Sequence, residues 1–250
     1  MKEHTHRLSR YGRKCREHLS RVRLSHQIAL RALSRDSVEF DQELEPLVQA
    51  SFGKGTQDRF HAKLRSVLNE VHLVGLKANF ELFLNLVLSV IWNAHFTELV
   101  SKIPSGKSVL LREFAESLVE GDGSSGNARE LIVGQIIPNY GLLELVRALR
   151  ESTGIDLPGV LYAKDFHYWP QIHVAFEVRH TIEHRDGKMD RVFRDKVERV
   201  WSNSSWGQRQ AIDLLQKISV DAQDIALTYD AMRHGAELLT DELVRWSSRN

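Results

Sequence analysis

The sequence predicts an all-α protein, and three observations support this fold class. Apolar residues recur at helical spacing over long ranges, most clearly from Phe60 through Leu64 to Val71. Alternating strand patterns are absent apart from one short run between Ile212 and Ile218. The prolines all lie in or beside breaks between helical stretches: Pro46, Pro104, Pro138, Pro158 and Pro170.

Helical patterns occupy these ranges in chain order: 5–35, 37–50, 56–103, 109–120, 128–136, 140–152, 170–186, 189–202 and a C-terminal helix with Ser219 as its N-cap. The range 56–103 is one helix or a kinked pair, and we expect it to form the spine of the core. Gly154 and Gly187 end two of the helices, because glycine readily adopts the left-handed conformation of a helix end. Residues 154–169 are expected to form an irregular but packed connection.

The composition is typical of a globular protein, with 42% hydrophobic and 27% charged residues. Its single cysteine, Cys15, excludes an intramolecular disulfide and a cysteine-based zinc site. The first seven residues lack the apolar core of a secretory signal, and the most apolar run, 82–97, is shorter than the ~20 residues of a membrane span. We therefore expect a cytoplasmic protein in which residues 82–97 form a buried core helix, with no membrane partner.

Positive charge is concentrated at the N-terminus. Residues 1–36 carry a net charge of +7, which leaves −6 for the rest of the chain. The sequence therefore divides into a basic N-terminal helical extension, 1–50, and a helical domain, 51–250. The extension is interpreted either as a surface for an anionic partner, nucleic acid first, or as the solvated face of a helix.

The helix predicted at 170–186 carries an unusual polar stripe. His173, Glu177, His180 and His184 follow one another at i, i+4, i+7 and i+11, which places them on one narrow face. Such a stripe can bind a metal, transfer protons or be a polar surface. Because the remaining chain offers no obvious second pair of ligands, a metal site is the less favoured of these interpretations.

Arg179 and His184 are the strongest candidates for chemistry on a phosphate. A histidine exchanges protons near neutral pH, and an arginine binds a phosphate and its developing negative charge. The two residues lie about 140° apart around an ideal helix, so we expect two antiparallel copies of the helix to assemble the site. Val174, Val178 and Ile182 would carry that dimer contact.

The segment Arg179-His180-Thr-Ile-Glu-His184, followed by Arg-Asp-Gly-Lys, resembles the signature of the HEPN superfamily. That signature is an arginine, a polar residue directly after it, and a histidine four to six residues beyond the arginine. The Asp-Gly-Lys tail is similar to stand-alone members related to ribonuclease-L-type domains. The resemblance covers about residues 57–248. One toxin subset carries tyrosine two residues after the histidine, where this chain has Asp186.

The resemblance implies a HEPN-like helical bundle acting as a metal-independent, cofactor-free endoribonuclease, usually a homodimer, in toxin or antiviral-defence systems. Its implied catalytic residues are Arg179 and His184, with His180 assisting them. RNA is then the substrate, and an antitoxin or another defence-system protein is a candidate partner. The alternative from a different class is a non-catalytic HEPN module that binds nucleotide or a protein.

Three further residues are candidates beside this catalytic set. Glu177, one turn before His180, is either the group that orients that imidazole or a plain helix-face carboxylate. Arg185 and Lys188 are either RNA-binding cations at the helix end or ordinary solvated charges.

Overall fold

Helices dominate the ranges that the computed structural model describes, which are residues 2–34, 57–94, 141–162 and 168–249. Extended pairing within these ranges is limited to one isolated antiparallel bridge between Lys188 and Lys217. The prediction of an all-α protein is confirmed.

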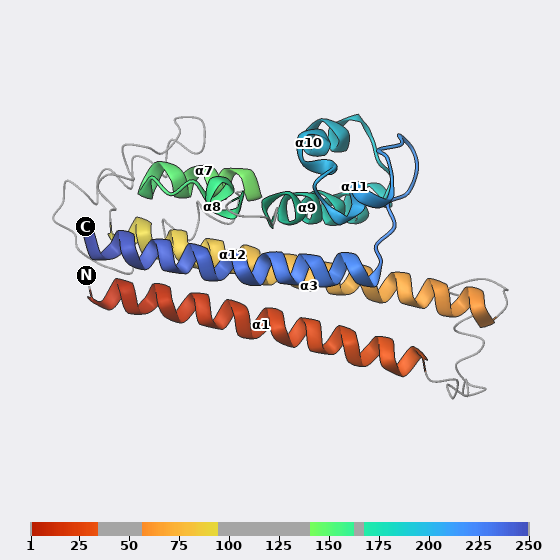
Figure 1. Cartoon of the computed structure of the whole chain (residues 1–250), viewed down its shortest axis with the longest axis horizontal. Helices are drawn as coiled ribbons and strands as arrows, with labels where there is room; N and C mark the ends of the chain where they lie inside the picture. Colours follow the sequence, from red (N-terminus) through yellow and green to blue (C-terminus); the bar gives the residue numbers. More distant parts are fainter. Residues whose placement is uncertain (1, 35–56, 95–140, 163–167, 250) are drawn as a thin grey trace, which may run out of the picture. The chain divides into compact units, whose positions relative to one another are not determined.

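The described helices follow in this order along the chain (Figure 1): α1 (Lys2–Ser34), α3 (Gln57–Ala94), α7 (Leu142–Thr153), α8 (Leu157–Tyr162), α9 (Tyr168–Arg185), α10 (Arg191–Trp201), α11 (Ser205–Arg209) and α12 (Ala222–Arg249). Within the described residues, the helices predicted near 5–35, 56–103, 140–152, 170–186, 189–202 and the C-terminus are all present. The helices predicted at 37–50, 109–120 and 128–136, the end of the range 56–103, and the boundary at residue 50 lie outside the described residues.

Two details of the predicted elements are wrong. Residues 157–162 form the short helix α8 rather than an irregular connection, beginning directly before Pro158, which a first helical turn tolerates. The N-cap of α12 is Asp221 and not Ser219. The Asp221 carboxylate accepts the Asp224 N–H at 2.8 Å, and the Asp221 carbonyl accepts the Ile225 N–H.

The chain divides into two compact units. Unit 1 comprises residues 1–15, 81–163 and 236–250, and unit 2 comprises residues 16–80 and 164–235. Helices α1, α3 and α12 are each divided between the two units, with one part in unit 1 and the other in unit 2.

In unit 1, α1 and α12 approach closely at Gly12. A Cβ atom at this position would lie 2.0 Å from the Thr240 hydroxyl oxygen, so a larger residue requires Thr240 or its helix to shift. The Thr5 and Ser247 hydroxyls, 2.9 Å apart, join the same two helices. The Trp92 indole N–H donates to the Ser152 hydroxyl at 2.9 Å and ties α3 to α7.

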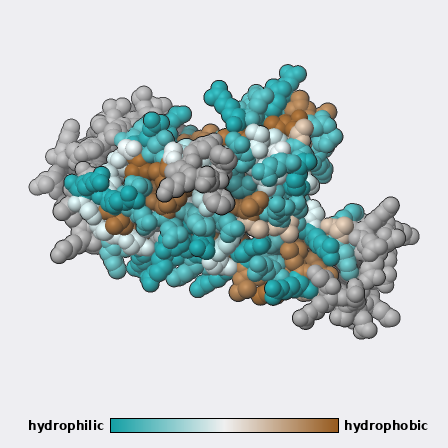
Figure 2. Space-filling model, in the orientation of Figure 1, coloured by the Kyte–Doolittle hydropathy of each residue, from teal (hydrophilic) through white to brown (hydrophobic). Residues whose placement is uncertain are grey.

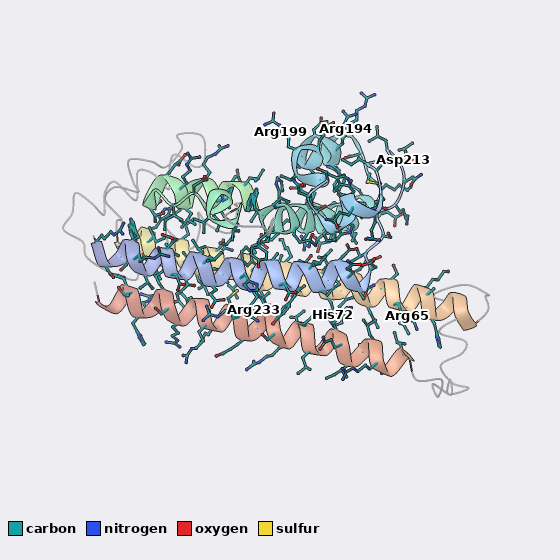
Figure 3. The ribbon with its side chains drawn as sticks, in the orientation of Figure 1. Arg65, His72, Arg194, Arg199, Asp213 and Arg233 are labelled. Carbon is teal, nitrogen blue, oxygen red and sulfur yellow. The ribbon has the colours of Figure 1, made fainter. Side chains whose placement is uncertain are left out.

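In unit 2, a pair of histidines joins α1 to α3. His26 and His72 have ring centroids 4.7 Å apart, and His72 is labelled between these helices in Figure 3. The His26 Nε2 atom lies 2.8 Å from the Asn69 side-chain oxygen, and Asn69 in turn donates to the Val220 carbonyl. Burial lowers the pKa of His26, because a charged ring would lose its hydration there.

Helix α1 is packed on one face and exposed on the other. Leu8, Cys15, Leu19 and His26 are buried, whereas Arg10, Lys14 and Arg21 are exposed. Figure 2 shows hydrophobic surface over the C-terminal half of this helix, where Leu24 and Ile28 are 57% and 58% exposed. The outer face of α1 therefore mixes basic and apolar side chains.

Helix α3 contains a long apolar stretch. From His61 to Ala94 it is long and apolar enough to cross a membrane by length and composition, and 44% of its most apolar window is buried inside the protein. Phe83, Val87 and Ile91 are buried, as expected for a core helix, whereas Leu82 is 50% exposed. Residues 95–97 of the predicted core run lie outside the described residues.

Candidate functional site

Helix α9 changes from buried to exposed along its length. Its first half, from Trp169 to Phe176, is buried on every face. The Phe176 ring meets Phe80 edge-on with centroids 6.4 Å apart, and the Lys77 ammonium lies 5.4 Å from the Phe176 centroid. From Arg179 onward most side chains reach solvent, so the polar end of α9 projects from a firmly packed beginning.

The C-terminal end of α9 is held by backbone hydrogen bonds. Asp186 and Gly187 adopt left-handed conformations with φ of 54° and 74°, which end the helix as predicted at Gly187. The Gly187 N–H donates to the Thr181 carbonyl at 3.0 Å, and the Gly187 carbonyl accepts the Ile218 N–H at 2.9 Å. These bonds fix the last turn of α9 against residues 215–218.

The predicted dimer contact is wrong for two of its three residues. Val174 and Val178 are fully buried among side chains of their own chain, and only Ile182 is partly exposed. A valine stripe packs equally well against the same chain or a second copy, and here the same chain covers it. Any dimer therefore uses other side chains than these two valines.

One carboxylate connects the two principal catalytic candidates. Glu183 forms an ion pair with the Arg179 guanidinium through one carboxylate oxygen. Its other oxygen lies 3.8 Å from His184 Nε2. Arg179 and His184 point in different directions on the helix, as the sequence indicates, and within a single protomer the Glu183 carboxylate pairs with Arg179 and lies near the His184 ring.

The two histidines at the end of α9 are neighbours. The ring centroids of His180 and His184 lie 4.6 Å apart, and the His184 side chain is 60% exposed. Burial, followed by the positive charge of Lys196, lowers the pKa of His180. His180 is therefore predominantly neutral near pH 7, as a proton acceptor must be.

The other half of the predicted stripe lies deeper. Glu177 accepts a hydrogen bond from the Lys196 ammonium of α10 at 2.9 Å, and its side chain is only 14% exposed. His173 is buried, its Nε2 atom has no hydrogen-bond partner within the described residues, and burial lowers its pKa. Glu177 is thus bonded to Lys196, while its negative charge acts on His180 by raising the pKa of that ring.

The cations proposed to bind RNA have different surroundings. Arg185 forms an ion pair with Asp190, the N-cap residue of α10. Lys188 is exposed and pairs through its backbone with Lys217, whose ammonium lies 2.9 Å from Asp186. That lysine lowers the pKa of Asp186 by hydrogen bonding to it. Arg185 is therefore engaged in holding the helix end, and Lys188 is the more accessible of the two.

The described residues do not contain a group of three or more metal-ligating side chains arranged to hold an ion. The side chains of the stripe from His173 to His184 do not converge on one point. His173 lies buried at one end, Glu177 is bonded to Lys196, and His184 is exposed at the other end.

Two polar residues of this region were not identified from the sequence. Glu183 is part of the motif segment, and its i, i+4 spacing from Arg179 is the signal that would have indicated an ion pair. Lys196 belongs to another helix and had no such signal. Figure 3 shows Arg194 and Arg199 of α10 extending outward, whereas Lys196 of the same helix bonds to Glu177.

Comparisons of the chain with models of protein families, with curated proteins and with solved structures found no match. The resemblance to the HEPN superfamily therefore rests on the motif residues and on their placement at the end of α9.

Proposed function

We propose that this protein is a metal-independent endoribonuclease in which Arg179 and His184 are catalytic and His180 assists them. The observation that carries the proposal is that a guanidinium and two neighbouring imidazoles all lie in the solvent-exposed last turns of a helix whose beginning is firmly packed. These groups bind an anion and exchange protons, which is what cleavage of a phosphodiester requires.

The proposed reaction uses the RNA's own 2′-hydroxyl as nucleophile. The 2′-oxygen forms a bond to the adjacent phosphorus while the bond from phosphorus to the 5′-oxygen breaks, giving a 2′,3′-cyclic phosphate and a 5′-hydroxyl. The rings of His180 and His184 together supply the acceptor for the 2′-hydroxyl proton and the donor for the 5′-oxygen. Arg179 stabilises the negative charge that grows on the phosphate oxygens.

The wider setting of this proposal comes mainly from the resemblance, which implies a homodimer, a toxin or antiviral-defence role, and an antitoxin or another defence-system protein as a candidate partner. The proposed cytoplasmic location comes from the composition, with its single cysteine. The exposed cations of α1, such as Arg10 and Lys14, suit an RNA backbone, and a solvated helix face remains the alternative for them. Light scattering tests the dimer, for which a monomer at working concentration is the contradicting result.

The test is incubation of the purified full chain with total RNA, with and without EDTA. We expect cleavage in both samples, 2′,3′-cyclic phosphate ends, and no cleavage of a DNA oligonucleotide of matching sequence. Activity that is lost in EDTA and restored by zinc or manganese would instead support metal ligation by the histidine stripe. Intact RNA in every sample would contradict the enzymatic proposal.

A non-catalytic HEPN module is the second candidate function. The observation that favours it is that Arg179 and Arg185 are both engaged by carboxylates of the same chain, Glu183 and Asp190. Such a module would bind nucleotide or a protein partner without cleaving RNA. Equilibrium binding of a nucleotide to a protein that leaves RNA intact would support this candidate.

A further inference from the structure

Glu183 occupies a position that the helix itself does not favour. A negative charge in the last turn of a helix opposes the helix dipole, which favours cations at that end. The order along the chain, with the cation Arg179 four residues before the anion, is also the weaker of the two i, i+4 arrangements. Local departures from helix preference of this kind are expected at functional sites.

The ion pair between Glu183 and Arg179 is held weakly. Both side chains keep contact with solvent, at 28% and 22% exposure, and pairs of this kind contribute only about 0.3–0.5 kcal/mol. The Arg179 Nε atom is buried and makes no hydrogen bond within the described residues. The guanidinium therefore has bonding capacity that the carboxylate does not use.

A phosphodiester offers the same kind of contacts as a carboxylate. Both groups present two acceptor oxygens with a shared negative charge, and arginine binds either of them through parallel N–H donors. Glu183 reaches towards Arg179 with one oxygen and towards His184 with the other, as the two free oxygens of an RNA phosphate would. The carboxylate and the phosphate cannot both occupy this position.

We propose that Glu183 is an internal competitor for the RNA phosphate: its carboxylate pairs with Arg179 beside the His184 ring in the unliganded protein and leaves when RNA binds. This inference rests on the proposed function, because it assigns a regulatory residue to the same site. Glu183 acts through Arg179 and is not itself a catalytic residue. Because an anion must displace the Glu183 carboxylate before it binds Arg179, Glu183 lowers the apparent affinity of the site for RNA.

The test measures binding apart from cleavage. The probe is a fluorescein-labelled 2′-O-methyl oligonucleotide, which lacks the nucleophilic hydroxyl, and the proteins are the parent, Glu183→Gln, Arg179→Ala and the double variant. We expect Glu183→Gln to bind about twofold more tightly than the parent, which is the fold-change that corresponds to an exposed ion pair of about 0.3–0.5 kcal/mol. In the Arg179→Ala background the same change should give no gain beyond that of a control. Glu198→Gln is that control, since it removes an exposed carboxylate from α10 in the same unit.

A second variant separates the effect of the negative charge at position 183 from that of the length of its side chain. Glu183→Asp keeps the charge but shortens the side chain by one methylene, so its carboxylate holds Arg179 less well and the gain in affinity should be intermediate. On cleavable RNA, Glu183→Gln should lower KM without raising kcat, which loss of a purely structural contact would not produce. Circular dichroism checks that each variant folds.

The outcomes distinguish this inference from the proposed function. Equal or weaker binding by Glu183→Gln, or a gain that persists without Arg179, overturns the inference even if the parent cleaves RNA. An Arg179-dependent gain in a protein that leaves RNA intact supports the competition at the anion site and overturns the ribonuclease proposal.

Discussion

The two ends of α9 use polar residues in opposite ways. At its beginning, Gln171 is buried and every polar atom of its side chain is bonded. At its end, Arg179, His180 and His184 are partly or largely exposed, and the Arg179 Nε atom has no partner within the described residues. One helix is thus anchored by a completed polar network at its beginning and carries partly exposed cationic and imidazole side chains at its end.

The completed network joins α9 to α11 and α12 within unit 2. The Gln171 amide donates to the Ser205 and Thr228 hydroxyls at 3.1 and 3.0 Å and accepts the Ser205 N–H at 2.9 Å. Ser205 donates to Asp224 at 2.5 Å, and the fully buried Asp224 carboxylate pairs with Arg209. A buried polar network of this kind stabilises one arrangement only when all its members are bonded.

The cluster of Arg179, His180 and His184 has the opposite properties. Its charges keep contact with solvent and its ion pair is weak. Groups in this condition are available to a ligand, whereas those of the buried network are not. We therefore expect substitutions at the end of α9 to change chemistry and substitutions at its beginning to change stability.

The largest expected effect is on catalysis. Arg179→Ala and His184→Ala should each lower the rate of RNA cleavage on the order of 10²–10⁴-fold, because one loses the phosphate-binding cation and the other a proton-transfer group. Their free energies of unfolding should change by less than about 1 kcal/mol, since both side chains reach solvent. Cleavage by both variants at the parental rate would remove these residues from the mechanism.

The next effect is on stability at the other end of the helix. Gln171→Ala removes three hydrogen bonds and leaves the buried Ser205 N–H without an acceptor. We expect the free energy of unfolding to fall by about 2–4 kcal/mol, measured by urea denaturation. Arg199→Ala, at an exposed position on α10, is the matched control and should change it by no more than about 0.5 kcal/mol. A loss of similar size in both variants would contradict the anchoring role of Gln171.

The sequence predicted α9 well because the signals for its ends lie in the helix itself. Pro170 suits a first turn and Gly187 a left-handed end, and both positions depend only on nearby backbone. The motif residues Arg179, His180 and His184 were likewise identified directly from their spacing. The spacing of the valines correctly indicated an apolar helix face. Periodicity does not tell which surface covers such a face, so Val174 and Val178 were wrongly assigned to a dimer contact.

Local sequence signals do not predict hydrogen bonds between residues that are distant in sequence. Lys196 meets Glu177 across two helices, 19 positions apart, and no local pattern links them. The network of Gln171 likewise depends on Ser205 and Thr228, which lie 34 and 57 positions away. Asp221 replaced the predicted cap Ser219 because the turn before α12 ends two residues later than the pattern suggested.

A smaller effect concerns the pH dependence of the buried network. Burial raises the pKa of Asp224 to about 6, above its ordinary carboxyl value, despite hydrogen bonds from Asp221 and Ser205 and the charge of Arg209. A group that holds its proton more tightly when folded contributes most stability below its unfolded pKa, near 4, and loses that contribution as pH rises through 6.

The difference in Tm between the parent and Asp224→Asn isolates this contribution, because asparagine does not titrate. The parent's Tm relative to the variant should fall between pH 4 and pH 7. A relative Tm that rises over this range would show that the ion pair with Arg209 outweighs the cost of burying the charge.

The smallest expected effect is on the pKa of His180, which lies between the buried beginning and the exposed end of α9. Lys196 lowers the pKa of His180 through its positive charge, second to burial. Lys196→Gln should therefore raise the pKa of His180, followed by the NMR shift of its ring protons during a pH titration. Lys217→Gln removes an exposed lysine that pairs with Asp186, and it serves as the control that should leave His180 unchanged. An unchanged pKa of His180 in Lys196→Gln would contradict the contribution assigned to the lysine charge.

The most direct test of the central comparison measures cleavage rate and Tm in the same samples of the parent, Arg179→Ala, His184→Ala and Gln171→Ala. We expect the two variants at the end of α9 to lose cleavage while keeping the parental Tm. Gln171→Ala should lose Tm yet cleave RNA at the parental rate below its own unfolding temperature. A rate that follows Tm across all variants would contradict the account, because the end of α9 would then contribute only to stability.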